Sequence, residues 1–239
     1  MWGAASAPLP LIFLRCKDTP AFKGNILMKI FFDVDGVLID GWHADAARRK
    51  PWDAELEEDL GVDRTRFQEL FFRGDPSPMQ ACVSGKRDLH EALVEVLPQT
   101  GYRGEVEDFI AYWFEKDSNV NEEVLTIAAE LSALPGTELY IATGQEHRRA
   151  RHLWQTLGFE NHFRKMFYSA RIGHLKPTLE FFSAINEALG ISEDERPVFF
   201  DDTPRIVAVA QAAGWDARLF ETAADIRTHP RVGPLLARG

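Results

Sequence analysis

The chain has 239 residues, 45% of them hydrophobic and 27% charged, a composition typical of a globular protein with one large domain or a core with a smaller insert. Its 37 acidic and 27 basic residues leave a formal net charge of −10, which argues against a nucleic-acid partner. No apolar run approaches the roughly 18 residues that span a bilayer, which argues against a membrane protein. The two cysteines, Cys16 and Cys82, give no disulfide framework and favour a cytoplasmic location.

Residues 1–27 precede a second methionine, Met28, which is followed at once by the first predicted strand. The stretch from Leu9 to Leu14 is apolar but short, and no basic segment precedes it, so we do not expect a signal peptide. We expect residues 1–27 to be a poorly ordered extension, with Met28 as the native start. The alternative is an N-terminal arm that packs on the core.

The first predicted strand, residues 29–34, leads into a pair of carboxylates. Its apolar residues, 30–32, are typical of a buried parallel strand, and Asp33 and Asp35 follow with one residue between them. Both side chains would share a face if the chain stayed extended. Because neighbouring carboxylates repel each other, such a pair indicates a cation site or proton transfer. The alternative is a solvated Asp-Gly turn.

Residues 41–134 contain no clear strand. Amphipathic patterns predict helices, and clusters of glycine and proline predict loops at residues 74–78 and 101–104. The expected helices are at residues 55–60, 64–72, 89–97, 106–114 and 122–134. We therefore expect an all-helical domain over residues 41–134, inserted after the first strand.

Strands and helices alternate in the rest of the chain. Further strands are expected at residues 138–143, 165–169, 197–202 and 216–220, with helices at 145–157, 179–189 and 204–213 between them. This alternation predicts an α/β core, residues 28–40 and 135–239, with a doubly wound, mostly parallel sheet. Ligands of such sheets bind at the carboxyl ends of the strands.

Four short motifs fall at these strand ends and helix starts. They read D-V-D-G-V-L at residues 33–38, I-A-T-G-Q at 141–145, G-H-L-K-P at 173–177 and V-F-F-D-D-T-P at 198–204. Together and in this order they resemble the four motifs of the haloacid dehalogenase (HAD) superfamily, over about residues 28–220. The resemblance implies a HAD-like Rossmannoid core and makes the helical insertion a cap domain.

The resemblance also implies roles for five residues. Asp33 would be the nucleophile that forms an aspartyl-phosphate, and Asp35 the general acid and base. Thr143 and the amide of Gly144 would bind phosphoryl oxygens, and Lys176 would supply positive charge. An aspartate at position 35 favours phosphoryl transfer, because dehalogenases and phosphonatases of the superfamily lack it.

A cation would bring a phosphate dianion near these carboxylates, and Mg²⁺ prefers oxygen ligands. By resemblance its ligands are the Asp33 carboxylate, the Asp35 main-chain carbonyl and an acid of the fourth motif. We favour Asp202 as the direct ligand and Asp201 as a second or outer-sphere partner. The alternative for this acidic pair is an N-cap of the helix that begins at Pro204.

The predicted cap should select the substrate. We favour Lys86 and Arg87, because a loop marked by Gly85 could carry both cations to an anionic or hydroxylated substrate. The other candidates are His43, Arg48, Arg49, Trp52 and Trp113.

The leading prediction is a Mg²⁺-dependent phosphatase for a small phosphorylated metabolite, for example a sugar phosphate. One alternative is a phosphosugar mutase, which shares all four motifs. Mutase relatives carry a cap histidine about twelve residues after the nucleophile, where this chain has Asp45 and, nearby, His43. A second alternative is a non-catalytic binding module, although Asp33, Asp35 and Lys176 are all retained. The sequence leaves the oligomeric state open.

Overall fold

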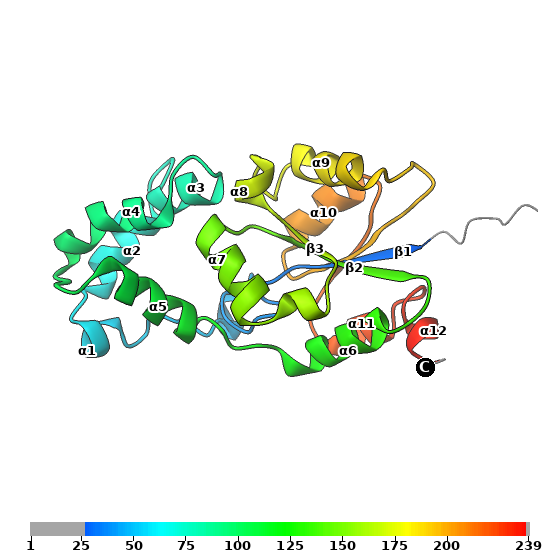
Figure 1. Ribbon diagram of the computed structural model, residues 1–239, viewed down its shortest axis with the longest axis horizontal. Helices are drawn as coiled ribbons and strands as arrows, with labels where there is room; N and C mark the ends of the chain where they lie inside the picture. Colours follow the sequence, from blue (N-terminus) through cyan, green and yellow to red (C-terminus); the bar gives the residue numbers. More distant parts are fainter. Residues whose placement is uncertain (1–26, 238–239) are drawn as a thin grey trace, which may run out of the picture.

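The computed structural model describes residues 27–237, and its centre is a parallel sheet of five strands (Figure 1). The predicted extension, with Cys16, lies outside the described residues except for Leu27. The strands are ordered β3-β2-β1-β4-β5, and all neighbours pair in parallel, which confirms the predicted doubly wound α/β core. Their bounds are β1 Met28–Phe32, β2 Thr137–Thr143, β3 Lys165–Tyr168, β4 Val198–Asp201 and β5 Asp216–Leu219.

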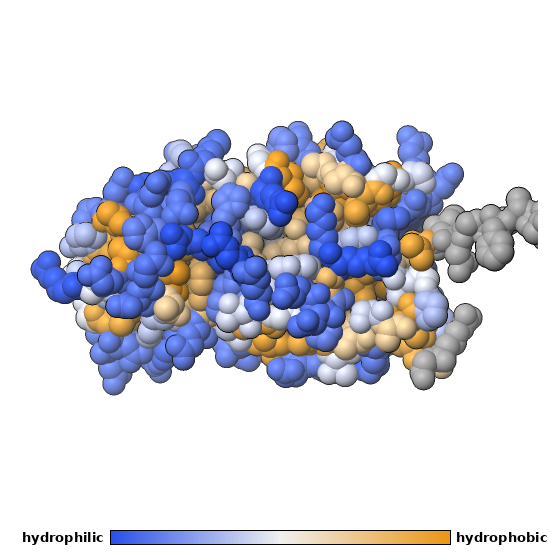
Figure 2. All heavy atoms as spheres, in the orientation of Figure 1, coloured by the Kyte–Doolittle hydropathy of each residue, from blue (hydrophilic) through white to orange (hydrophobic). Residues whose placement is uncertain are grey.

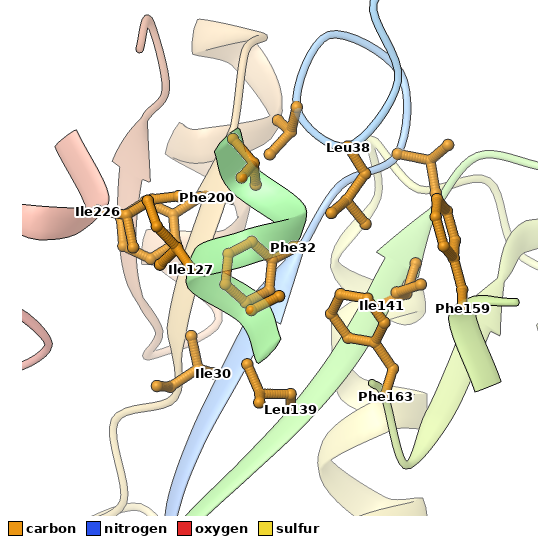
Figure 3. Packing of buried hydrophobic residues seen from close by; sticks show 14 of the residues in the cluster. Ile30, Phe32, Leu38, Ile127, Leu139, Ile141, Phe159, Phe163, Phe200 and Ile226 are labelled. Atoms are coloured by element: carbon orange, nitrogen blue, oxygen red, sulfur yellow. The ribbon is translucent and has the colours of Figure 1, made fainter. Parts of the chain in front are cut away.

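The central strand β1 is buried on both faces. Ile30 and Phe32 point to one face, where they pack with α6 (Glu122–Ser132), as Figure 3 shows. Phe31 points to the other face and packs beneath α9 (Leu179–Leu189) and α10 (Pro204–Ala212). This explains the unbroken apolar run, since a strand covered on both sides has no solvent-facing position.

Short helices complete the core. A π-helical turn extends α7, and α11 and α12 lie beside α6 on the sheet (Figure 1). No helix among residues 27–237 is long and apolar enough to cross a membrane. The remaining bounds are α7 His147–Arg151, η3 His152–Thr156, η4 Phe159–Asn161, α8 Ser169–Ile172, α11 Ala223–Arg227 and α12 Gly233–Leu236.

Five helices between β1 and β2, called the insertion below, form a second unit beside the sheet (Figure 1). They enclose a separate hydrophobic cluster rich in aromatic rings, among them Phe67, Phe71, Phe109 and Trp113. The helices are α1 Leu56–Leu60, α2 Arg64–Phe72, α3 Pro78–Val83, α4 Leu89–Val96 and α5 Val106–Lys116, with 3₁₀ turns η1 Ala46–Arg48 and η2 Leu97–Thr100.

Two details of the predicted insertion were wrong. Helix α3 was not expected, because Pro78 suggested a loop; in the structure the proline occupies the first turn and Ser77 caps the helix. Helix α6 was expected in the insertion, yet Val124, Ile127 and Leu131 pack in the cluster of the core sheet. An amphipathic pattern shows which face of a helix is buried, but not which unit covers it.

Two adjacent linkers join the insertion to the core. The outgoing linker follows Leu38, and the returning linker follows α5. They run antiparallel, with hydrogen bonds from Asp40 N to Asn119 O (2.7 Å) and from Asn121 N to Leu38 O (2.9 Å). The insertion is therefore attached at one place, beside the carboxyl end of β1.

Candidate active site at the carboxyl edge of the sheet

Three neighbouring strands deliver the predicted site residues to one edge. Asp33 follows β1, Thr143 ends β2 and Asp201 ends β4, and β1 lies between the other two strands. Lys176 reaches the same place from the segment between α8 and α9. Because parallel strands end at a common edge, residues from four distant segments meet there.

Lys176 is a buried cation held between two buried carboxylates. Its Nζ lies 2.5 Å from Asp33 Oδ2 and 2.8 Å from Asp201 Oδ2. Burial opposes the charge of Lys176, but Asp201 and Asp33 outweigh it and raise the pKa of the amine. Burial also raises the pKa of the Asp33 carboxyl well above its usual range; Lys176 opposes this, and Asp201 and Asp35 add to it. Further positive charge here would favour the ionised form of Asp33.

Asp33, Asp201 and Asp202 can share a metal ion. Each offers a carboxylate oxygen, and these oxygens lie within 4.8 Å of one another. Lys176 and the amide of Thr203 already bind the two oxygens of Asp201. Neutral donors bind Asp202, whose Oδ2 accepts a hydrogen bond from Ala44 N at 2.7 Å. An all-oxygen donor set suits a hard cation such as Mg²⁺.

Gly36 makes room for Asp202. Its φ of +78° lies in the left-handed region, and a Cβ atom there would stand 2.3 Å from Asp202 Oδ2. The glycine therefore lets the turn after β1 approach the carboxylate closely.

Gly36→Ala should reduce turnover by roughly 100-fold, because displacement of Asp202 by about 1 Å disturbs the acidic cluster. Steady-state kinetics as a function of Mg²⁺ concentration would measure the loss. Gly190→Ala is the matched control, since Gly190 has a φ of +60° and nothing within 4 Å of its Cβ position. Equal activity of the two variants would contradict this role for Gly36.

Thr143 has a buried hydroxyl that no described group satisfies. Its Oγ1 has no hydrogen-bond partner, although the residue is fully buried at the end of β2. An unpaired buried hydroxyl is costly and is expected to find a partner. The next residue, Gly144, lines the cavity described below. The helix predicted at residues 145–157 begins later than expected, at His147, because Glu146 caps α7.

Asp35 lies in a polar network that the sequence did not reveal. Its Oδ2 accepts a hydrogen bond from Gln145 Nε2 (2.6 Å), and its Oδ1 accepts one from Arg149 Nη1 (3.0 Å). Arg149 also lies 3.1 Å from Asp117. Burial raises the pKa of Asp117 to about 6, although Arg149 opposes the shift. Both Gln145 and Arg149 are buried.

A cavity of about 500 Å³ lies between this network and the insertion. Its core side is formed by Asp35, Gly144, Gln145 and Arg149, and its linker side by Asp117. The insertion and its outgoing linker supply a mixed wall of aromatic, apolar and charged side chains: Trp42, Arg49, Lys50, Trp52, Asp53, Arg64, Gln68, Phe72, Met79 and Trp113.

The structure separates the predicted cap candidates. Arg49, Trp52 and Trp113 line the cavity. His43 Nδ1 lies 3.5 Å from Asp202 Oδ2, whereas Arg48 donates to the carbonyl of Glu221 outside the cavity.

The two favoured candidates do not line the cavity. Lys86 is exposed, and Arg87 pairs with Glu95 at 2.5 Å. A Cβ on Gly85 would stand 2.4 Å from Ala170 O, so this loop packs against α8 instead. The structure therefore gives the prediction for Lys86 and Arg87 no support from the cavity, because a loop's composition does not show which surface covers it.

Comparison with protein families gives one match. The model of the family described as haloacid dehalogenase-like hydrolase matches residues 29–214, which is most of the chain. The comparison with curated proteins finds no match.

Solved structures share the fold at low sequence identity. A HAD family enzyme from Bacteroides thetaiotaomicron, in complex with magnesium and inorganic phosphate, has a TM-score of 0.65 and 19% identity over 82% of this chain and 94% of its own. A predicted HAD-like hydrolase from Porphyromonas gingivalis has a TM-score of 0.65 and 18% identity, over 88% and 98%. A 2-haloacid dehalogenase from Pseudomonas syringae has a TM-score of 0.58 and 21% identity, over 89% and 99%. With the four motifs at one sheet edge, the family match shows that this chain belongs to the haloacid dehalogenase-like hydrolases.

Proposed function

We propose that this hydrolase is a Mg²⁺-dependent phosphatase that cleaves a small phosphorylated metabolite through an aspartyl-phosphate. The observation that carries the proposal is that the two carboxylates of the first motif lie in different surroundings. Asp33 is buried against Lys176 within the acidic cluster, whereas Asp35 lines the cavity. Displacement of a halide would need no second carboxyl group, while an alkoxide leaving group must be protonated.

Asp33, Asp202 and the main-chain carbonyl of Asp35 would hold the metal ion. When bound, Mg²⁺ would neutralise charge on the phosphate and on the carboxylates around it. Magnesium in the Bacteroides relative supports this choice of cofactor.

The chain's own residues divide the reaction between them. The Asp33 carboxylate attacks phosphorus while Asp35 gives its proton to the departing oxygen. Asp35 then takes a proton from the water that hydrolyses the aspartyl-phosphate. The unpaired hydroxyl of Thr143 donates to a phosphoryl oxygen, and Lys176 stabilises the negative charge that surrounds Asp33.

The volume of the cavity supports a small substrate. About 500 Å³ accommodates a compact metabolite and lies in the range of small-molecule sites. We therefore propose that the insertion acts as the cap that selects the substrate.

The mutase alternative gains no support from the insertion. Asp45, at the position of the mutase histidine, is exposed and accepts a hydrogen bond from Ala47 N at 2.9 Å. His43 faces Asp202 and does not line the cavity.

A screen for phosphate release would test the proposed function. The purified protein with Mg²⁺ would be given small phosphomonoesters, and in parallel 2-haloacids with detection of halide. We expect phosphate from a narrow set of esters and no halide. Halide release without phosphate release would overturn the proposal in favour of a dehalogenase.

Arg49→Met should raise the KM for the best ester by about tenfold or more, because Arg49 lines the cavity and, among residues 27–237, donates to the main-chain carbonyls of His43 and Ala44 and to no carboxylate. Initial rates over a range of ester concentrations would measure the change. The matched control is Lys86→Met, which removes a cation from outside the cavity and should leave the KM unchanged. A larger effect from Lys86→Met would return the substrate contact to the loop at Gly85.

A further inference from the structure

Arg149 is a buried cation that touches both Asp35 and the returning linker. It lies on α7, and only 6% of its surface is exposed. Its Nη1 donates to Asp35 Oδ1 at 3.0 Å, and its Nη2 donates to Asp117 O at 3.2 Å and lies 3.1 Å from Asp117 Oδ2. A buried guanidinium requires such partners, since an unpaired charge in the interior is strongly unfavourable.

The Asp35 end of this network is fully constrained. Gln145 holds one carboxylate oxygen and Arg149 holds the other, and Arg149 Nη1 also lies 3.5 Å from Gln145 Oε1. The carboxyl group nevertheless lines the cavity, and 21% of its side chain is exposed. Its contacts therefore orient the group without covering it.

The Asp117 end lies where the insertion returns to the core. Asp117 directly follows α5, and its Oδ1 lies so close to the outgoing linker that a Cβ on Gly41 would stand 2.6 Å from it. Arg149, a residue of the core, is thus in contact with the segment that joins the insertion to the core. A guanidinium is planar and rigid, so the separation between its two partners is set by its own geometry.

We propose that Arg149 is a positioning residue, whose guanidinium fixes the Asp35 carboxyl group relative to the linker at Asp117. The orientation of Asp35, the proposed general acid and base, then depends on the position of the insertion relative to the core. This inference rests on the proposed function, in which Asp35 moves the protons.

A double-mutant cycle separates positioning from a purely structural role. With p-nitrophenyl phosphate and Mg²⁺, Arg149→Met should lower kcat by at least about tenfold and change KM little, because general acid–base catalysis is worth this much or more. In an Asp35→Asn background the same substitution should lower kcat by less than about twofold, since its target is gone. Nitrophenolate leaves without protonation, so the first step still proceeds in Asp35→Asn. The loss of kcat then reports the second step, in which Asp35 takes a proton from the water that hydrolyses the aspartyl-phosphate.

Asp117→Asn tests the linker end of the network. It should lower kcat in the wild-type background and have no further effect when Arg149 is already methionine. Arg148→Met is the matched control on the same helix. Arg148 pairs with Glu107 and Asp88 of the insertion but does not touch Asp35, so its loss should leave kcat unchanged. Figure 2 shows hydrophilic residues where the insertion meets the core.

The outcomes are distinct. Losses that multiply in the double variant, or an Arg149→Met enzyme as fast as wild type, would overturn the positioning role and leave the phosphatase standing. A wild-type protein that releases no nitrophenolate and no phosphate from any ester of the screen would overturn both. If Arg149→Met fails to fold by circular dichroism, Arg149→Lys serves in the same cycle, because it keeps the buried charge but loses the rigid two-sided contact.

Discussion

Asp33→Asn is expected to abolish phosphate release while leaving the fold intact. The amide has nearly the shape of the carboxylate but cannot attack phosphorus, so turnover should fall by at least about 1,000-fold. The fold should persist because the substitution removes one of several mutually repelling buried carboxylates, and Lys176 keeps Asp201 as its partner at 2.8 Å. Phosphate release and thermal unfolding would be measured on the same preparation.

Asp40→Asn is the matched control for this experiment. Asp40 also follows β1, but its carboxylate is 43% exposed and pairs with Lys50 at the surface. Turnover by this variant should equal that of the wild type. Substantial residual activity in Asp33→Asn would show that another group attacks the substrate.

Lys176→Met should both inactivate and destabilise the protein. It leaves Asp33 and Asp201 buried without their cation, and breaking a buried ion pair on one side costs about 3–5 kcal/mol. For a chain of this size the melting temperature should fall by about 10 °C. Calorimetry without added metal would measure the change.

Lys29→Met is a control with a simpler ion pair. Lys29 Nζ lies 2.6 Å from Glu195 Oε2, and both side chains keep some contact with solvent, so the loss should be about 1 kcal/mol or less. Adding Asp201→Asn to Lys176→Met should restore part of the stability by removing an unpaired charge. An equally stable Lys176→Met variant would mean that solvent or ions already compensate these carboxylates.

The sequence was sufficient to predict the sheet and to identify the candidate residues at its edge. Asp33, Thr143 and Asp201 each end or follow an apolar strand, the resemblance to the superfamily motifs singled them out, and parallel topology brings them together. Lys176 was predicted from the resemblance of residues 173–177 to the third motif of the superfamily. The strand ends and the motifs are both short stretches of sequence, so they could be recognised without knowledge of the long-range packing.

The network around Asp35 could not be predicted in this way. Arg149 is one of three arginines in the five residues of α7, and it alone among them is buried. The helical pattern does not distinguish it from Arg148, because its burial depends on Asp117 and the linkers. The same limit explains why α6 was assigned to the insertion and why Lys86 was expected at the cavity, since long-range packing decides both.

During synthesis, β1 leaves the ribosome long before either of its neighbours exists. Phe31 lies beside Tyr140 of β2 and Phe199 of β4, each more than 100 residues later in the chain. The insertion has its own hydrophobic cluster, so it can become compact while the apolar β1 is still unpaired. Pairing along the second edge of β1 then has to wait for β4, and we expect this long-range pairing to limit the folding rate. The nascent chain is therefore most exposed to aggregation between the appearance of the insertion and that of β4.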